Sequence, residues 1–180
     1  MPDYRTIVQK PGAAYIPLVE KQISSGGSVD LYQHLCMENA LTMMHETAVG
    51  AGLDGISALQ KSEIMQILQQ VATLRLNALS RPRECYFQTR KKKQPDGNWT
   101  TSIEMGIEGD GNDVILRNFG HGVEEVYPYW DVHVDDEFTY PVHHGIDVEP
   151  PTWKRCGTGK YARVVYPVRF TDGTVRYFIS

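Results

Sequence analysis

The pattern of apolar residues changes at Pro82, and this change limits the possible folds more than any other feature of the sequence. Before Pro82, apolar residues recur at helical spacing. After it, short runs rich in β-branched and aromatic residues alternate with turns that contain Gly, Pro, Asn and Asp, which indicates antiparallel strands. This order predicts the α+β class, with N-terminal helices followed by β-hairpins packed around a short helix.

The part before Pro82 predicts two helices behind an N-terminal arm. Prolines and glycines interrupt residues 1–27, which we expect to form an arm or an irregular cap. Ser28 or Asp30 can cap a first helix that runs to about residue 49. A second helix fits residues 56–76, because apolar residues recur there near helical spacing.

The part after Pro82 predicts two hairpins with less regular structure between them. Residues 84–90 and 99–107 form the first, and its turn at 94–98 contains a proline that presets φ and a glycine that accepts positive φ. Residues 161–169 and 175–179 form the last. Between the hairpins we expect a loop over 109–113 that caps a short helix over 114–119, a strand over 123–134 interrupted at Pro128, a strand over 137–140, and a loop over 141–151.

Length and composition fit one globular domain, which we place at residues 28–180. A chain of 180 residues with 41% hydrophobic residues can bury a core. Cys36, Cys85 and Cys156 lie far apart and form no CxxC pair or zinc spacing, which favours a reducing cytoplasm. The sequence has no signal peptide and no run that would span a membrane, so we expect no membrane partner.

Charge is strongly segregated along the chain, although the formal net charge is only −4. Residues 81–93 and residues 154–180 each carry six basic side chains and one acidic side chain. Residues 94–153 between them carry one basic and 13 acidic side chains. Two blocks near +5 therefore flank a block near −12, and such segregation usually serves a charged partner. The alternative is two solvated strand ends and one solvated acidic face.

The basic residues near the tip of the first hairpin are the main candidates for binding nucleic acid. Lys and Arg at a hairpin tip can reach phosphates, and nearby aromatic rings can stack on the bases of a single strand. The second basic block would then line the opposite wall of a groove. The alternative is that the tip is only solvated and the aromatic residues belong to the core. The DNA-binding candidates are Arg81, Arg83, Tyr86, Arg90, Lys91, Lys92, Lys93, Trp99, Lys154, Arg155, Lys160 and Arg163.

The acidic residues, histidines and cysteines suggest no catalytic site, so we expect neither an enzyme nor a cofactor. Glu108, Asp110 and Asp113 lack the full spacing of a calcium loop, and helix capping explains them more simply. Residues 135–137 could hold a divalent ion such as Mg²⁺ together with His133, although a solvated turn is the simpler explanation. The acidic face could also meet the basic face of a second copy, head to tail.

Several short motifs in the second half of the chain resemble RecT-type phage recombinases. The first is Leu74 to Leu79 followed by Glu84-Cys85-Tyr86-Phe87, where a helix leads into a Cys-Tyr strand. Others are Gly111 through Ile115-Leu116-Arg117 to Gly120, Asp135 to Tyr140 with Gly145, and the last hairpin with Gly159-Lys160, Tyr166, Asp172-Gly173 and Ile179-Ser180. The resemblance covers roughly residues 65–180.

The resemblance implies a single-strand annealing protein of a phage or prophage. Such proteins bind single-stranded DNA, assemble into rings or helical filaments, and anneal complementary strands into a duplex without ATP during homologous recombination. They work beside a 5′→3′ exonuclease, contact the host single-strand-binding protein, and act in the bacterial cytoplasm. Family members continue past the last hairpin with a C-terminal region, which we expect to be absent from this sequence.

Two departures and two other functions stay open. The acidic loop 109–113 and the insert Pro150-Pro151-Thr152-Trp153 differ from the family pattern. The first alternative function is a metal-dependent nuclease that acts on DNA through Glu108, Asp110, Asp113 and Asp135-Asp136. The second is a structural phage protein whose charge segregation serves self-assembly alone.

Overall fold

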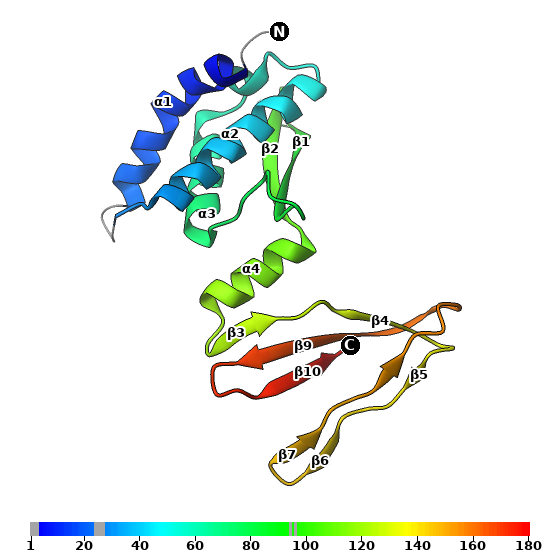
Figure 1. Ribbon diagram of the computed structural model, residues 1–180. Coiled ribbons are helices and arrows are strands. Elements are labelled where there is room, and N and C mark those ends of the chain that lie inside the picture. Colours follow the sequence, from blue (N-terminus) through cyan, green and yellow to red (C-terminus); the bar gives the residue numbers. More distant parts are fainter. Residues whose placement is uncertain (1–3, 24–27, 94, 96) are drawn as a thin grey trace. The chain divides into compact units, whose positions relative to one another are not determined.

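The computed structural model describes residues 4–23, 28–93, 95 and 97–180 (Figure 1). It confirms the α+β class, because helices form the N-terminal part and antiparallel strands follow. The chain divides into two compact units, Met1–Ile115 and Leu116–Ser180, whereas the sequence predicts one domain over residues 28–180. Within the described ranges, no helix combines the length and apolarity needed to cross a bilayer.

A helix takes the place of the irregular arm predicted for residues 1–27. Helix α1 (Tyr4–Ile23) continues through Pro11 and Pro17, although a proline inside a helix costs about 3 kcal/mol. Ile16 and Val19 are buried in the core of the first unit. Burying two such side chains contributes about 1.5–3 kcal/mol each, which is comparable to the cost of the two prolines. The prediction of an arm was therefore wrong for the described residues 4–23.

Helix α2 (Leu31–Gly50) begins where the sequence predicts, with Asp30 as its N-cap. The Asp30 carboxylate accepts from the Gln33 N–H at 2.9 Å, and the Gln33 side chain accepts from the Asp30 N–H at 3.0 Å. This capping box satisfies two backbone donors at the start of the helix. Arg75 also donates to Asp30 at 2.6 Å, which ties the start of α2 to the residue after helix α3 (Lys61–Leu74).

The second predicted helix, over residues 56–76, is divided. Gly55–Ala58 form a short 3₁₀ helix, η1, and α3 starts only at Lys61. Gly55 has φ +62, and the His45 ring occupies the place where a β-carbon of residue 55 would lie, 2.4 Å away. A glycine is needed here because any side chain would collide with His45, so tertiary packing sets the break.

The first predicted hairpin is confirmed, with β1 (Cys85–Lys93) antiparallel to β2 (Trp99–Ile107). Cys85, Phe87 and Ile103 are buried in the same core as α2 and α3. Gly97 has φ +86, as the predicted turn requires, and Gln94 and Asp96 of that turn lie outside the described residues.

Helix α4 (Gly109–Phe119) follows the hairpin and begins five residues before the predicted start at residue 114. Its first turn is closed by the Asn112 N–H, which donates to the Glu108 carbonyl at 3.1 Å. Gly111 is buried, and a β-carbon there would lie 2.0 Å from the Glu84 carbonyl oxygen. The helix can therefore start this close to the base of β1 only because residue 111 is a glycine.

The second unit is built on the long strand β9 (Tyr161–Phe170). Strand β10 (Val175–Ile179) pairs along one side of β9 and completes the predicted last hairpin. Strands β3 (Val123–Val126) and β4 (Trp130–His133) pair with successive parts of its other side. The predicted interruption at Pro128 is confirmed, because a proline cannot donate to a strand ladder.

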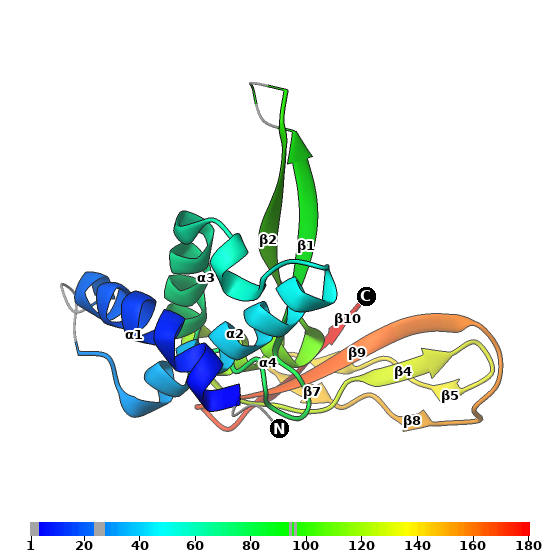
Figure 2. The same ribbon diagram turned by 90° about the horizontal axis from the view of Figure 1, so that it is seen from above.

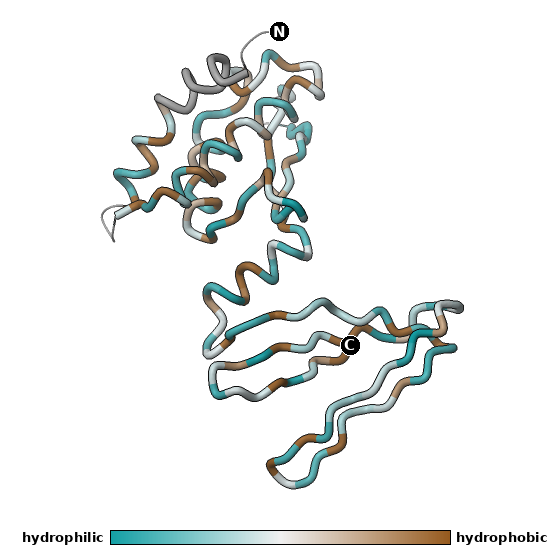
Figure 3. The backbone as a smooth tube through the Cα atoms, in the orientation of Figure 1, coloured by the Kyte–Doolittle hydropathy of each residue, from teal (hydrophilic) through white to brown (hydrophobic). Residues whose placement is uncertain are grey.

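An extended arm replaces the loop predicted over residues 141–151. Strand β5 (Glu137–Phe138) pairs with β8 (Trp153–Lys154), and β6 (Val142–His144) pairs with β7 (Asp147–Glu149). Gly145 has φ +69, and it turns the chain before Ile146, which is 99% exposed. Figure 3 shows hydrophobic positions at the tip of this arm. All residues of β6 and β7 are exposed, so the sequence there lacks the alternation that marks a half-buried strand.

Candidate nucleic-acid interface

The tip of the β1–β2 hairpin presents the four consecutive cations Arg90 to Lys93 to solvent. Figure 2 shows the hairpin extending beyond helices α2 and α3 of the same unit. The first half of β1 is anchored by buried residues, whereas residues 90–93 are all exposed. The hairpin thus combines a fixed base with a charged end that can reach a partner.

Strand alternation sorts these cations onto two faces of the hairpin. Arg90 and Lys92 lie on one face, where both pair with Glu104 of β2, at 2.8 Å and 3.4 Å between nitrogen and oxygen. Lys91 and Lys93 lie on the other face, and no ion pair holds either of them within the described residues. Exposed ion pairs are weak, but one carboxylate still cancels part of the field of two cations. Lys91 and Lys93 are therefore the stronger candidates for phosphate contacts.

The two aromatic candidates of the hairpin have different surroundings. Trp99 is directly opposite Lys93, on the same face, and is 64% exposed. Tyr86 is half-buried, and its ring covers Gly106 on the neighbouring strand, where a β-carbon would lie 2.2 Å from the ring. A ring placed over a strand glycine stabilises the pairing of the two strands. The structure thus gives Tyr86 a packing role and leaves the Trp99 ring open.

Arg81 and Arg83 are exposed on the connection between α3 and β1. This connection is fixed by Glu84, whose carboxylate accepts from the Asn77 N–H at 2.6 Å and whose carbonyl accepts from the Glu108 N–H at 3.0 Å. Strand β1, nine residues from Cys85 to Lys93, spans about 26 Å between its end residues. The six cations predicted as one block therefore form two groups, at opposite ends of β1.

The cations of the second block belong to the second unit, and two of the four are engaged there. Lys154 pairs with Glu137 at 2.9 Å. The guanidinium of Arg163 lies over the rings of Phe138 and Tyr140, at 4.9 Å and 4.8 Å from their centres. This contact holds the base of the arm against β9, although a guanidinium stacked on rings keeps N–H groups at its edge.

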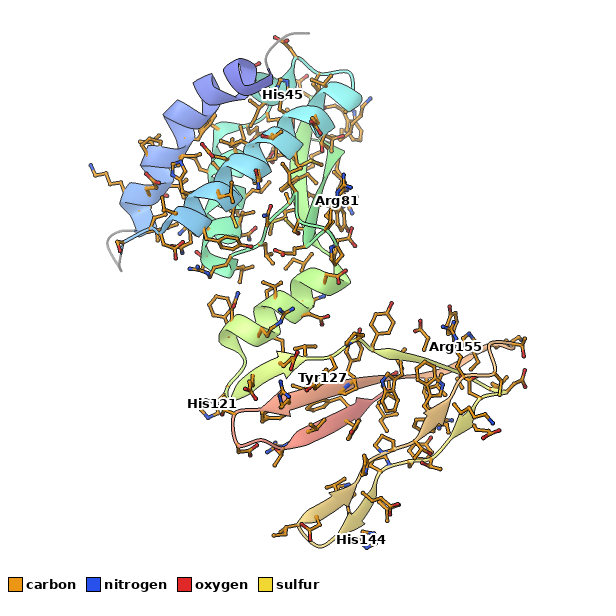
Figure 4. The ribbon with its side chains drawn as sticks, viewed as in Figure 1. His45, Arg81, His121, Tyr127, His144 and Arg155 are labelled. Atoms are coloured by element: carbon orange, nitrogen blue, oxygen red, sulfur yellow. The ribbon has the colours of Figure 1, made fainter. Side chains whose placement is uncertain are left out.

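Arg155 and Lys160 are exposed, and no ion pair with a described residue engages them. Figure 4 shows Arg155 and His144 at opposite ends of the arm. That these residues and the hairpin tip line one groove stays a prediction.

Asp136 organises the corner between β4, β5 and β8, although the sequence suggests a solvated turn or a metal ligand. Its side chain is shielded from solvent. It accepts from the backbone N–H groups of His133 and Cys156 at 2.9 Å and 2.7 Å and from the Trp153 indole at 2.8 Å. The backbone bond from His133, followed by the bond from Trp153, holds the pKa of Asp136 far below its usual value.

Both oxygens of Asp136 thus accept bonds from the protein, which argues against its service as a metal ligand. No cluster of three or more His, Cys, Asp or Glu residues suited to a metal occurs among the described residues. Glu108 precedes α4 and Asp110 lies in its first turn, where acidic side chains interact favourably with the helix N-terminus, and Asp113 lies one turn further on.

The cysteine of the first hairpin packs rather than reacts. Cys85 is fully buried, and burial raises the pKa of its thiol to about 12. Burial likewise raises the pKa of Cys36 to about 11. A thiol with so high a pKa contributes almost no thiolate at neutral pH, so the basic residues beside Cys85 do not activate it.

Comparison with known protein families, curated proteins and solved structures finds no match to this chain. The resemblance to RecT-type recombinases therefore stays a hypothesis based on the motifs quoted above. The pairing of Glu104 with Arg90 and Lys92 was not predicted from the sequence. Counting residues across the 94–98 turn places Glu104 opposite Gln88, on the same face as Arg90 two positions further along β1. The predicted register could therefore have indicated this ion pair.

Proposed function

We propose that this protein binds single-stranded DNA and anneals complementary strands without ATP, as an oligomer in phage-type homologous recombination. The observation that carries the proposal is the exposed hairpin tip, where Lys91 and Lys93 share a face with the exposed ring of Trp99. Cations beside an open ring suit a flexible single strand, because phosphates and bases are then both available for contact.

Annealing requires that the protein hold the phosphates and leave the pairing edges of the bases free. Long Lys and Arg side chains meet this requirement, because they attract phosphates without reading sequence. A base stacked on Trp99 would also keep its hydrogen-bonding edge exposed. The proposal needs no bond-making chemistry, and no catalytic group enters it.

The wider role follows from the resemblance and is part of the proposal. The protein would assemble with itself into rings or helical filaments in the bacterial cytoplasm. It would act beside a 5′→3′ exonuclease and the host single-strand-binding protein. Mg²⁺ is not required for phosphate contacts made by Lys and Arg.

An annealing assay tests this proposal. Two complementary fluorescently labelled 50-mer oligonucleotides are added one after the other, without ATP, and duplex formation is followed by energy transfer. We expect the wild type to accelerate annealing, and replacement of Arg90 to Lys93 by alanine to slow it on the order of tenfold through weaker phosphate contact. Equal rates with and without the wild-type protein would refute the proposal. Shortening of the oligonucleotides only when Mg²⁺ is added would support the nuclease alternative instead.

A further inference from the structure

The main sheet of the second unit has two chemically different faces. Trp130, directly opposite Val165, lies on one face. It stacks on Trp153 with ring centres 5.7 Å apart and contacts Tyr177 at 5.9 Å. Val165 and Val132 on this face are fully buried. This face therefore contains the core of the unit, covered by the base of the arm.

The opposite face carries a strip of exposed aromatic rings. Tyr166 of β9 and Phe178 of β10 are directly opposite each other in the ladder. The ring of Tyr129 lies 5.5 Å from that of Tyr166. Exposed fractions are 52% for Tyr129, 37% for Tyr166 and 54% for Phe178. We call these three residues the aromatic strip.

A cation lies near the strip on the same face. Arg176 is opposite Val168, two pairs further along the hairpin from Tyr166 and Phe178, and its guanidinium lies 4.3 Å from the Phe170 ring centre. Its nearest carboxylate, Asp172, is 4.0 Å away. Half-buried Asp131, opposite Val164, is an acidic group on this face.

The chemistry of the strip favours nucleobases over a second protein. Its three large exposed apolar side chains are all aromatic, whereas the valines of the same face, Val164 and Val168, are half-buried or buried. Flat rings on neighbouring strands, about 4.8 Å apart, are the arrangement with which sheets stack two or three successive bases. Arg176 on the same face complements the phosphates that accompany those bases.

We infer that Tyr129, Tyr166 and Phe178 form a stacking platform for successive bases of single-stranded DNA. The inference rests on the proposed function and adds a base-contacting surface in the second unit to the Trp99 ring of the first. The hairpin tip would hold phosphates. On the platform, each base would stack on an aromatic side chain through one face of the base, which leaves the pairing edges of the base free. From the sequence, only Tyr86 and Trp99 were predicted to stack on bases.

The test separates base contacts from phosphate contacts. Binding of a 30-mer of thymidines and of an abasic 30-mer with the same phosphates is measured by fluorescence anisotropy. The variant Y129L/F178L keeps apolar volume but removes two rings, and F119L/Y161L removes one Phe and one Tyr, both exposed, outside the strip. We expect Y129L/F178L to lose at least about fivefold in affinity for the thymidine oligonucleotide per ring removed, with unchanged affinity for the abasic one.

Y129F/F178Y, which keeps both rings, and F119L/Y161L should bind as the wild type does. Equal loss of affinity in F119L/Y161L and Y129L/F178L would overturn the platform. If Y129L/F178L loses its near-ultraviolet circular dichroism, the variant is not folded and only the wild type is compared on the two oligonucleotides. Equal affinity of the wild type for the thymidine and abasic oligonucleotides would then overturn the platform. A wild type that binds neither oligonucleotide would refute the proposed function itself, so the two failures are distinguishable.

Discussion

At the scale of single residues, the fold depends on a close approach that only glycine permits. A β-carbon on Gly111 would lie 2.0 Å from the backbone oxygen of Glu84, whereas one on Gly109, two residues earlier in α4, meets nothing within 4 Å. The obstacle is a backbone atom, so the helix and the base of β1 would have to move apart. The sequence alone marks both residues only as glycines of one loop.

We therefore expect Gly111→Ala to lower the free energy of unfolding by about 2 kcal/mol or more, as overpacking does. In a unit of this size, the melting temperature should fall by at least about 5 °C. Gly109→Ala is the matched control and should leave the melting temperature nearly unchanged. Equal melting temperatures for the two variants, measured by circular dichroism, would contradict the close approach.

A second residue-scale feature is the buried carboxylate of Asp136. Its pKa in the folded protein lies below the ordinary value of 3.8, so the unfolded chain takes up its proton first as pH falls. Its contribution to stability is therefore complete above about pH 5 and is lost as pH falls through 3.8 toward the folded-state pKa. The sequence could not indicate this, because two of its donors, from Trp153 and Cys156, come from 17 and 20 residues further along the chain.

We expect Asp136→Asn to destabilise the second unit at pH 7 and to differ less from the wild type near pH 3. Urea unfolding followed by the fluorescence of Trp130 and Trp153, in a Trp99→Phe background, measures this difference. Asp135→Asn removes the neighbouring, exposed carboxylate and should show no such pH dependence. A stability difference between wild type and Asp136→Asn that is the same at both pH values would count against the buried-carboxylate role.

At the scale of elements, the hairpin register decides which cations are available. Glu104 pairs with Arg90 and Lys92 at the same time, so it competes with any phosphate for these two side chains. A carboxylate here also repels the phosphate backbone directly. The hairpin thus offers fewer available cations to the proposed DNA ligand than its four consecutive cations suggest.

We expect Glu104→Gln to increase affinity for single-stranded DNA and to steepen the dependence of that affinity on salt. If Arg90 and Lys92 both contact phosphates in the variant, the slope of log affinity against log salt concentration should become steeper by up to about 1.4. Glu46→Gln, which neutralises an exposed carboxylate on α2, is the control for net charge. Filter binding or anisotropy at several salt concentrations measures both variants. Lower or unchanged affinity for Glu104→Gln would show that the hairpin does not contact phosphates.

Elements were predicted well where burial leaves a periodic pattern and poorly where it does not. Helix α2, the β1–β2 hairpin, the break at Pro128 and the β9–β10 hairpin follow from capping, turn residues and alternation. Helix α1 was missed because its helix-breaking residues are offset by long-range burial of Ile16 and Val19. Strands β6 and β7 were missed because they are exposed on both faces.

At the scale of the whole molecule, the chain is two units with different surfaces. The first unit has an aliphatic core and the charged hairpin, while the second contains 12 of the 18 aromatic residues. Counting charges along the sequence locates both basic blocks, but it cannot say which cations are paired. Lys154 and Arg163 are engaged within the second unit, and this pairing depends on contacts between residues 17 to 25 positions apart. The sequence therefore predicts the charge pattern of the candidate site better than its individual contacts.

The central claim is that unpaired cations of the hairpin tip hold the phosphates of single-stranded DNA. The most direct test is the salt dependence of oligonucleotide affinity for the wild type, for K91A/K93A and for K21A/K61A, which removes two exposed lysines elsewhere in the first unit. We predict that the logarithmic slope becomes less steep by about 1.4 in K91A/K93A and stays unchanged in K21A/K61A. The same slope in all three proteins, or no binding by the wild type at low salt, would contradict the account.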